Sequence, residues 1–223
     1  MLQQINKKIL VYFFLFLLLA TLNNKSLNNF NFPKISSIEF IGLGEESSKF
    51  IKNFELFKMS NIFFLDKLKI KRLMDSNNTI EEYTIFKRYP STLEINVIKT
   101  KFLAYLNKDG KKFYVGSNGK LIEVKSEIKN LPYIFGDLNI NEFLKLKKTI
   151  DKSNLNYNEI KNLFFFQSGR WDIEKNSGTL IKLPNKELKE SLKLSLSILN
   201  NNKFGKIKTI DVRQKNQVII NEQ

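Results

Sequence analysis

The amino-acid sequence predicts an α+β protein in which one apolar N-terminal helix precedes a β-α-α-β-β unit and then a mixed αβ domain with an antiparallel-rich sheet. Three observations lead to this prediction. Residues 9–22 carry no charge, and residues 92–97 alternate apolar and polar side chains with the period of a strand. After residue 101, an Asp-Gly and an Asn-Gly dipeptide indicate hairpin turns.

The uncharged run from Ile9 to Leu22 predicts a helix with apolar side chains on every face. As a helix this run reaches about 21 Å, short of the hydrocarbon core of a bilayer, which is about 30 Å thick. Residues 20–22, Ala-Thr-Leu, match the small-residue cleavage site of a secretory signal poorly. The sequence therefore favours a transmembrane anchor over residues 9–27, with a cleaved signal peptide as the alternative.

Lysines set the expected orientation of this helix. Lys7 and Lys8 directly precede the apolar run, against Lys25 and the more distant Lys34 after it. The positive-inside rule then places a short tail, residues 1–8, in the cytoplasm and the rest of the chain outside. Because this tail is too short to form a site, we expect the outer part of the chain to carry the function.

Residues 35–101 predict the β-α-α-β-β unit, with a hairpin around Pro90 as its last two strands. Its first strand and two helices are expected to place these apolar residues in the core: Ile38, Phe40, Phe50, Ile51, Phe54, Phe57, Ile70, Leu73 and Met74. In the final strand, Leu93 and Ile95 are expected to face the core, and Glu94 to face water.

Residues 102–223 predict hairpins and two helices. Asp109-Gly110 and Asn118-Gly119 are the expected turns. One helix carries Phe143 and Ile150, and the other carries a leucine stripe from Leu188 to Leu199. Trp171 begins a strand between the two helices and is expected to pack beneath the second of them.

The composition excludes most catalytic chemistry. The chain has no Cys and no His, which removes Cys/His metal sites, thiolate nucleophiles and Ser-His-Asp arrangements. Neighbouring carboxylates such as Glu81 and Glu82 point to opposite faces of a strand, and no phosphate-binding glycine loop is present. We therefore predict no enzyme, no cofactor, no metal site and no small-molecule substrate.

The charge of the chain does not indicate a nucleic-acid-binding protein. The formal net charge is +15, but the basic residues are spread along the chain and most are lysines. The arginines suited to bidentate contacts with bases and phosphates are few: Arg72, Arg88, Arg170 and Arg213. Nucleic acid is therefore not an expected partner.

Several phrases, in their order and spacing, resemble the FtsQ/DivIB family of bacterial cell-division proteins, which carry a POTRA domain. The matching phrases are ISSIEFIGL at 35–43, MSNIFFLD at 59–66, RYPSTLEINV at 88–97, LPYIFG at 131–136, GRWDIEKNSGTLIKLP at 169–184 and IKTIDVRQKNQVII at 207–220. One departure is KTKFLA at 99–104, which keeps Ala104 but lacks the Glu and Pro usual in the family.

This resemblance implies a single-pass scaffold of the divisome in the cell inner membrane at the division septum, without catalysis. It implies a periplasmic POTRA domain at 35–101 and a C-terminal αβ domain at 102–223. The implied partners are FtsB and FtsL for the C-terminal domain, and FtsK and other divisome proteins for the POTRA domain. Two other classes remain open: another exported POTRA-containing assembly or secretion factor, and an exported enzyme that uses Asp, Glu or Lys.

The closing strand is the expected partner-binding site, with Arg213, Gln217, Val218, Ile219 and Ile220 as its residues. Because the chain ends almost as soon as this strand does, we expect one row of its backbone groups to stay unpaired. A partner strand would complete such an edge by β-augmentation, and Arg213 would pair with an acidic partner residue. The alternative is that this strand only completes the core.

Overall fold

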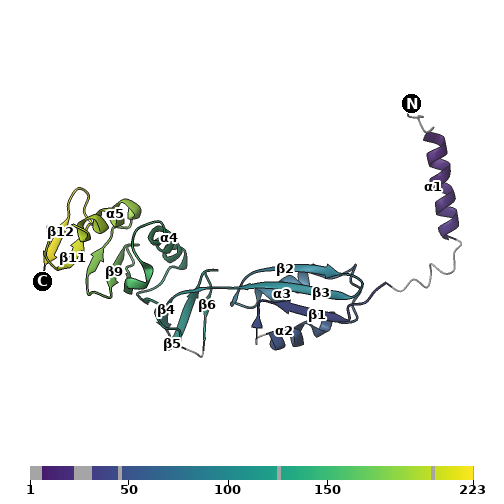
Figure 1. Ribbon diagram of the computed structural model, residues 1–223, viewed down its shortest axis with the longest axis horizontal. Helices are drawn as coiled ribbons and strands as arrows, with labels where there is room; N and C mark the ends of the chain where they lie inside the picture. Colours follow the sequence, from purple (N-terminus) through teal and green to yellow (C-terminus); the bar gives the residue numbers. More distant parts are fainter. Residues whose placement is uncertain (1–6, 23–31, 45–46, 125–126, 202–203, 223) are drawn as a thin grey trace. The chain divides into compact units, whose positions relative to one another are not determined.

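A computed structural model describes residues 7–22, 32–44, 47–124, 127–201 and 204–222 (Figure 1). The described strands form one three-stranded sheet and one nine-stranded sheet. Most of the predicted cytoplasmic tail and the end of the predicted anchor, residues 1–6 and 23–27, lie outside the described residues.

Helix α1, Lys7–Leu22, is the predicted apolar helix (Figure 1). Its side chains from Ile9 to Leu19 are 45–71% exposed, so no face of the helix is covered by the described protein. At 16 residues it is short, and within the described part of the chain no helix combines the length and apolar character needed to cross a membrane.

The described residues divide into two compact units. One comprises those of Met1–Phe40, Glu45–Lys67 and Ile85–Ile95, and the other comprises those of Ile41–Gly44, Leu68–Thr84 and Asn96–Gln223.

The elements that follow α1 occur in the predicted order β-α-α-β-β. They are β1 (Ser37–Ile41), α2 (Ser47–Phe54), the 3₁₀ helix η3 (Glu55–Phe57), α3 (Lys67–Asp75), β2 (Ile80–Arg88) and β3 (Thr92–Lys99). The strands pair in the order β1-β3-β2, so the first and last strands in sequence are neighbours. The helical periodicity predicted through Phe57 is realised as an α-helix whose last turn tightens to 3₁₀ geometry.

Aromatic side chains of α2 and η3 form a core, as the helical spacing predicted. Phe50, Phe54 and Phe57 are at most 7% exposed. The Phe40 ring of β1 lies 5.1 Å from the Phe54 ring in an edge-to-face arrangement and 5.7 Å from the Phe50 ring. Such pairs add stabilisation beyond the area they bury.

Strand β3 confirms one half of its predicted alternation and corrects the other. Leu93 and Ile95 are fully buried, as expected. The expectation that Glu94 faces water was wrong, because Glu94 is only 5% exposed and accepts a hydrogen bond from the Arg88 guanidinium. A charged partner allows a carboxylate to be buried where an isolated one would be excluded.

Two substitutions in β3 compare the burial of an apolar side chain with the burial of a paired carboxylate. We expect Ile95→Ala to reduce the free energy of unfolding by about 2–5 kcal/mol, through lost burial and the cavity left behind. Glu94→Ala is expected to destabilise the chain less, because the exposed Arg88 side chain that loses its partner remains solvated. Melting curves of both variants followed by circular dichroism test this order, and equal shifts would contradict it.

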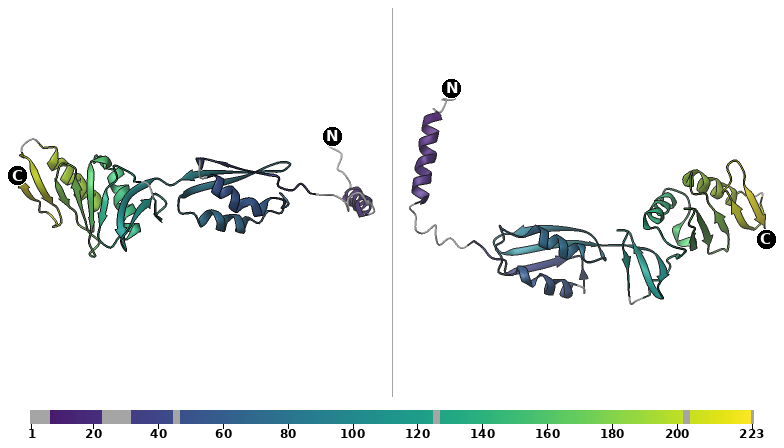
Figure 2. Two further views of the ribbon diagram at one scale, coloured as in Figure 1. Left: turned by 90° about the horizontal axis from the view of Figure 1, so that it is seen from below. Right: turned by 180° about the vertical axis from the view of Figure 1, so that it is seen from behind.

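Residues after 101 form the nine-stranded sheet and its helices. The elements are β4 (Phe102–Lys108), β5 (Lys111–Gly116), β6 (Leu121–Ile122), β7 (Tyr133–Phe135), α4 (Ile140–Asp151), η4 (Tyr157–Glu159), β8 (Ile160–Phe165), β9 (Trp171–Lys175), β10 (Leu180–Lys182), α5 (Leu188–Leu199), β11 (Ile207–Asp211) and β12 (Ile219–Glu222). The strand order is β12-β11-β10-β9-β8-β7-β4-β5-β6, and Figure 2 shows these strands side by side.

This sheet is mixed and rich in antiparallel pairs, as predicted. Strands β4 and β7, β7 and β8, and β10 and β11 pair in parallel, while the other neighbours are antiparallel. Helix α4 connects β7 to β8 and α5 connects β10 to β11, because parallel neighbours need a long crossover. The second crossover places β11 and β12 at one end of the sheet.

Trp171 lies at the centre of the core formed by this sheet and its helices. It is fully buried, which confirms its predicted burial. Its ring lies 4.7 Å from the Phe165 ring of β8 and 6.4 Å from the Phe143 ring of α4. Leu192 of α5 belongs to the same buried cluster, so one core joins both crossover helices to the strands.

Candidate protein-binding edge

Strand β12 is a terminal strand of the nine-stranded sheet. It pairs with β11 in antiparallel register, with Ile219 opposite Asp211 and Ile220 opposite Ile210. Along its other side, no strand pairs with it within the part of the chain that the structure describes. The strand begins at Ile219, so Gln217 and Val218 lie in the connection before it.

Side chains near β12 alternate between the core and the surface. Val218 and Ile220 pack against the core beneath the sheet, whereas Ile219 is 53% exposed. The segment therefore contributes to the core on one face while its backbone edge stays open. The two interpretations of this strand offered by the sequence are compatible, because face and edge are different surfaces of one strand.

A row of alternating charge leads across the sheet to Ile219. Lys182 of β10 is in register with Asp172 of β9 on one side and with Asp211 of β11 on the other. Asp211 is in register with Ile219 of β12. Residues in register share a face of the sheet, so an added strand would place its next side chain beside Ile219.

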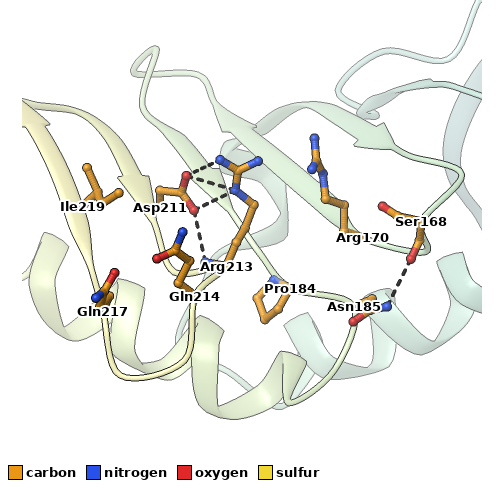
Figure 3. A pocket seen from close by; sticks show the side chains of 9 residues that line it. All are labelled: Ser168, Arg170, Pro184, Asn185, Asp211, Arg213, Gln214, Gln217 and Ile219. Atoms are coloured by element: carbon orange, nitrogen blue, oxygen red, sulfur yellow. Dashed lines mark hydrogen bonds and ion pairs between the residues drawn. The ribbon is translucent and has the colours of Figure 1, made fainter.

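Arg213 is held by Asp211 close to the start of the connection to β12 (Figure 3). Its Nε atom donates to Oδ1 of Asp211 at 2.8 Å and to Oδ2 at 3.0 Å, and its backbone N–H donates to Oδ1 at 3.1 Å. These hydrogen bonds lower the pKa of Asp211 and raise the pKa of Arg213. The charge of Arg213 is thus already offset within the chain.

A surface cavity of about 450 Å³ lies between this ion pair and the edge strand (Figure 3). It is lined by Ser168, Arg170, Pro184, Asn185, Asp211, Arg213, Gln214, Gln217 and Ile219. The structure thus brings together three of the five residues expected at the site, Arg213, Gln217 and Ile219. The other two, Val218 and Ile220, pack against the core.

Arg170 and Asp172 also belong to this region, although neither was predicted as a partner-binding residue. Nε of Arg170 and Oδ1 of Asp172 are buried atoms without a hydrogen-bond partner among the described residues. The Arg170 guanidinium lies 4.0 Å from the centroid of the Phe166 ring, and burial raises the pKa of Asp172. Strand alternation was the available signal, since residues on either side of the inward Trp171 point away from the core.

Asp211 and Asp172 predict opposite dependences of stability on pH. The folded state lowers the pKa of Asp211, so its ionised form stabilises the fold above the ordinary value of 3.8, and this contribution is lost at lower pH. Asp211→Asn should therefore lower the melting temperature at neutral pH and lose that effect in acid.

Asp172→Asn is the matched comparison. The folded state raises the pKa of Asp172, so its ionised form is disfavoured at neutral pH, and the penalty disappears as the pH falls to 3.8. This variant should raise the melting temperature at neutral pH and leave it unchanged in acid. Melting curves at the two pH values that show the same trend for both variants would contradict the assignment.

The described residues hold no group of three or more His, Cys, Asp or Glu side chains arranged to bind a metal ion. What this edge does offer is a row of backbone groups, an exposed isoleucine, and two arginines beside a cavity. An open strand edge of this kind is the surface that recognition by strand addition requires.

Comparison with known proteins identifies relatives of the chain. The family model described as "Cell division protein FtsQ/DivIB, C-terminal" matches residues 104–213. Cell division protein DivIB of Clostridium botulinum (strain Loch Maree / Type A3) is 34% identical over 152 residues, which cover 65% of this chain and 58% of that protein. Cell division protein FtsQ of Rickettsia bellii is 26% identical over 175 residues, covering 73% and 62%. The chain thus spans about 60% of the length of these relatives.

Among solved structures, the major extracytoplasmic domain of DivIB from Geobacillus stearothermophilus aligns with 45% of this chain and 92% of that domain. The TM-score is 0.35 at 14% identity, which is too low to establish a common arrangement.

Proposed function

We propose that this chain is a non-catalytic scaffold of the FtsQ/DivIB kind that links divisome proteins at the division septum; its similarity to cell division proteins FtsQ and DivIB supports this. The observation that carries the proposal is the open edge of β12 beside the Arg170 and Arg213 cavity. A protein that works by linking others needs surfaces that accept other chains, and an unpaired strand is such a surface.

The proposed layout follows the membrane topology expected of a septal scaffold. Residues 9–27 anchor the chain in the cell inner membrane, with the N-terminus in the cytoplasm. A POTRA domain at 35–101 and a C-terminal domain at 102–223 lie in the periplasm. Support comes from the apolar side chains of α1, exposed on all sides, and from the family match at 104–213, which falls within the second domain.

FtsB, paired with FtsL, is the proposed partner of the C-terminal domain. A strand of FtsB adds to β12, and a side chain of the added strand packs beside Ile219. The backbone ladder supplies affinity and the side-chain contacts supply selectivity. FtsK and other divisome proteins are the proposed partners of the POTRA domain.

The two arginines beside the edge have different proposed roles. Arg213 is paired with Asp211, so it fixes the start of the connection that leads through Gln217 and Val218 to β12. Arg170 keeps a buried Nε donor without a partner among the described residues, and it lines the same cavity. We assign Arg170 the contact with an acceptor group on the partner, because an unsatisfied buried donor gains most from a new acceptor.

Removing the Arg170 side chain tests this assignment. Arg170→Ala should weaken binding of the full chain, held in detergent, to purified FtsB by about tenfold or more, since a hydrogen bond to a charged group contributes about 1.5–3 kcal/mol. Arg72→Ala is the control, because Arg72 is an exposed residue of α3 outside this cavity. Dissociation constants from biolayer interferometry should separate the two variants. Unchanged binding by a folded Arg170→Ala chain would contradict the role of this arginine.

A further inference from the structure

Four aromatic residues form a cluster that the proposed function does not use: Phe32, Phe63, Phe64 and Tyr89, hereafter the aromatic cluster. The Phe32 ring lies 5.9 Å from the Phe63 ring and 5.6 Å from the Phe64 ring, both edge to face. The Phe63 and Tyr89 rings stack at 5.1 Å. The cluster joins three segments of the chain, and contacts between the rings hold these segments together.

These rings are far more exposed than aromatic side chains usually are. Phe64 is 76% exposed, Tyr89 59%, Phe63 46% and Phe32 45%. A contiguous exposed apolar patch of this kind marks an interaction site on a soluble domain. By contrast, Phe54 in the core of the same unit has no exposure at all.

The backbone beneath the aromatic cluster is fixed, and lysines accompany it. Asn61 forms a β-bridge with Lys34, and its Oδ1 accepts a hydrogen bond from the Phe63 backbone at 2.8 Å. The ammonium of Lys87 donates to the Phe63 carbonyl at 3.2 Å, and Lys34 is exposed. Rings with an ammonium group beside them suit the headgroup level of a bilayer, where aromatic and basic side chains gather.

The position of the cluster in the chain favours the membrane surface as the partner that covers it. Phe32 follows Leu22, the end of α1, by only ten positions in the sequence. Even fully extended, such a segment spans at most about 35 Å. If α1 lies in the bilayer, the aromatic cluster therefore stays close to the membrane surface at all times, and that surface is present at high effective concentration.

We infer that the aromatic cluster docks on the outer surface of the membrane, with its rings at the headgroup level and Lys34 and Lys87 against anionic lipid. This inference rests on the proposed anchoring of α1. Docking holds this end of the first unit against the bilayer. A division protein covering the cluster in place of lipid is the competing occupant.

Tryptophan fluorescence of the full chain tests the inference. The native chain has one tryptophan, Trp171, which is fully buried and supplies a constant background. Phe64→Trp adds a ring within the cluster, and Ile98→Trp adds one at another exposed position, 59% exposed, near the end of β3. The chains are reconstituted in phosphatidylcholine and phosphatidylglycerol vesicles with or without brominated acyl chains, which quench only nearby tryptophan.

We expect brominated lipid to quench most of the emission added by Phe64→Trp and to leave the emission added by Ile98→Trp. The emission added by Phe64→Trp should also lie at shorter wavelength. Alkaline extraction of the same vesicles reports separately on α1. If the chain resists alkaline extraction but brominated lipid leaves the emission of Phe64→Trp unchanged, the docking is overturned and the anchor stands. Equal quenching of both variants would overturn docking through this cluster, and extraction of the chain at alkaline pH would overturn the anchor and the docking together.

Discussion

Trp171→Ala is expected to reduce the free energy of unfolding by about 3–5 kcal/mol, the usual cost of removing a large aromatic side chain from a core. Trp171 is fully buried and contacts rings of both β8 and α4. The cluster that contains it also holds Leu192 of α5, so the cavity would open where both crossover helices meet the sheet. Because α5 leads into β11, this change should also destabilise β11, the strand with which β12 pairs.

Trp171→Phe is the matched control for this prediction. It keeps an aromatic ring and removes an indole Nε1 that has no hydrogen-bond partner among the described residues, so no bond is lost with it. We expect it to destabilise the chain clearly less than Trp171→Ala. Circular dichroism is the suitable probe, because both variants lose the tryptophan fluorescence. Equal losses of stability in the two variants would show that packing of an aromatic ring is not what Trp171 contributes to the fold.

Features set by short-range periodicity were predictable from the sequence. The helical spacing of Phe50, Phe54 and Phe57 identified buried positions correctly, and so did the alternation of Leu93 and Ile95. A face that is buried must repeat with the period of its element, so the pattern alone is enough. The apolar helix at the N-terminus was recognisable from a different signal, the uncharged run of residues 9–22, because it is apolar on every face.

Features that depend on contacts between side chains of different strands were not predictable. Glu94 occupies a polar position in the alternation, but Arg88 across the hairpin allows its burial. The row from Asp172 through Lys182 to Asp211 exists only because two crossovers set the strand order. Arg170 and Gln217 line one cavity although they are 47 positions apart in the sequence.

Ile219→Pro is expected to abolish most partner binding while the chain stays folded. Proline removes a backbone N–H and fixes φ, which interrupts a ladder built on β12. An edge strand tolerates proline better than a central strand, and the Ile219 side chain is exposed, so little core is lost. Ile219→Ala keeps the N–H and is the control that separates backbone pairing from side-chain contact.

The most direct test of strand addition at β12 is a pull-down of purified FtsB by the full chain in detergent, with wild type, Ile219→Ala and Ile219→Pro compared beside their melting curves. We expect Ile219→Pro to melt cooperatively and to capture little FtsB, and Ile219→Ala to capture much more. Undiminished capture of FtsB by a folded Ile219→Pro chain would contradict the mechanism.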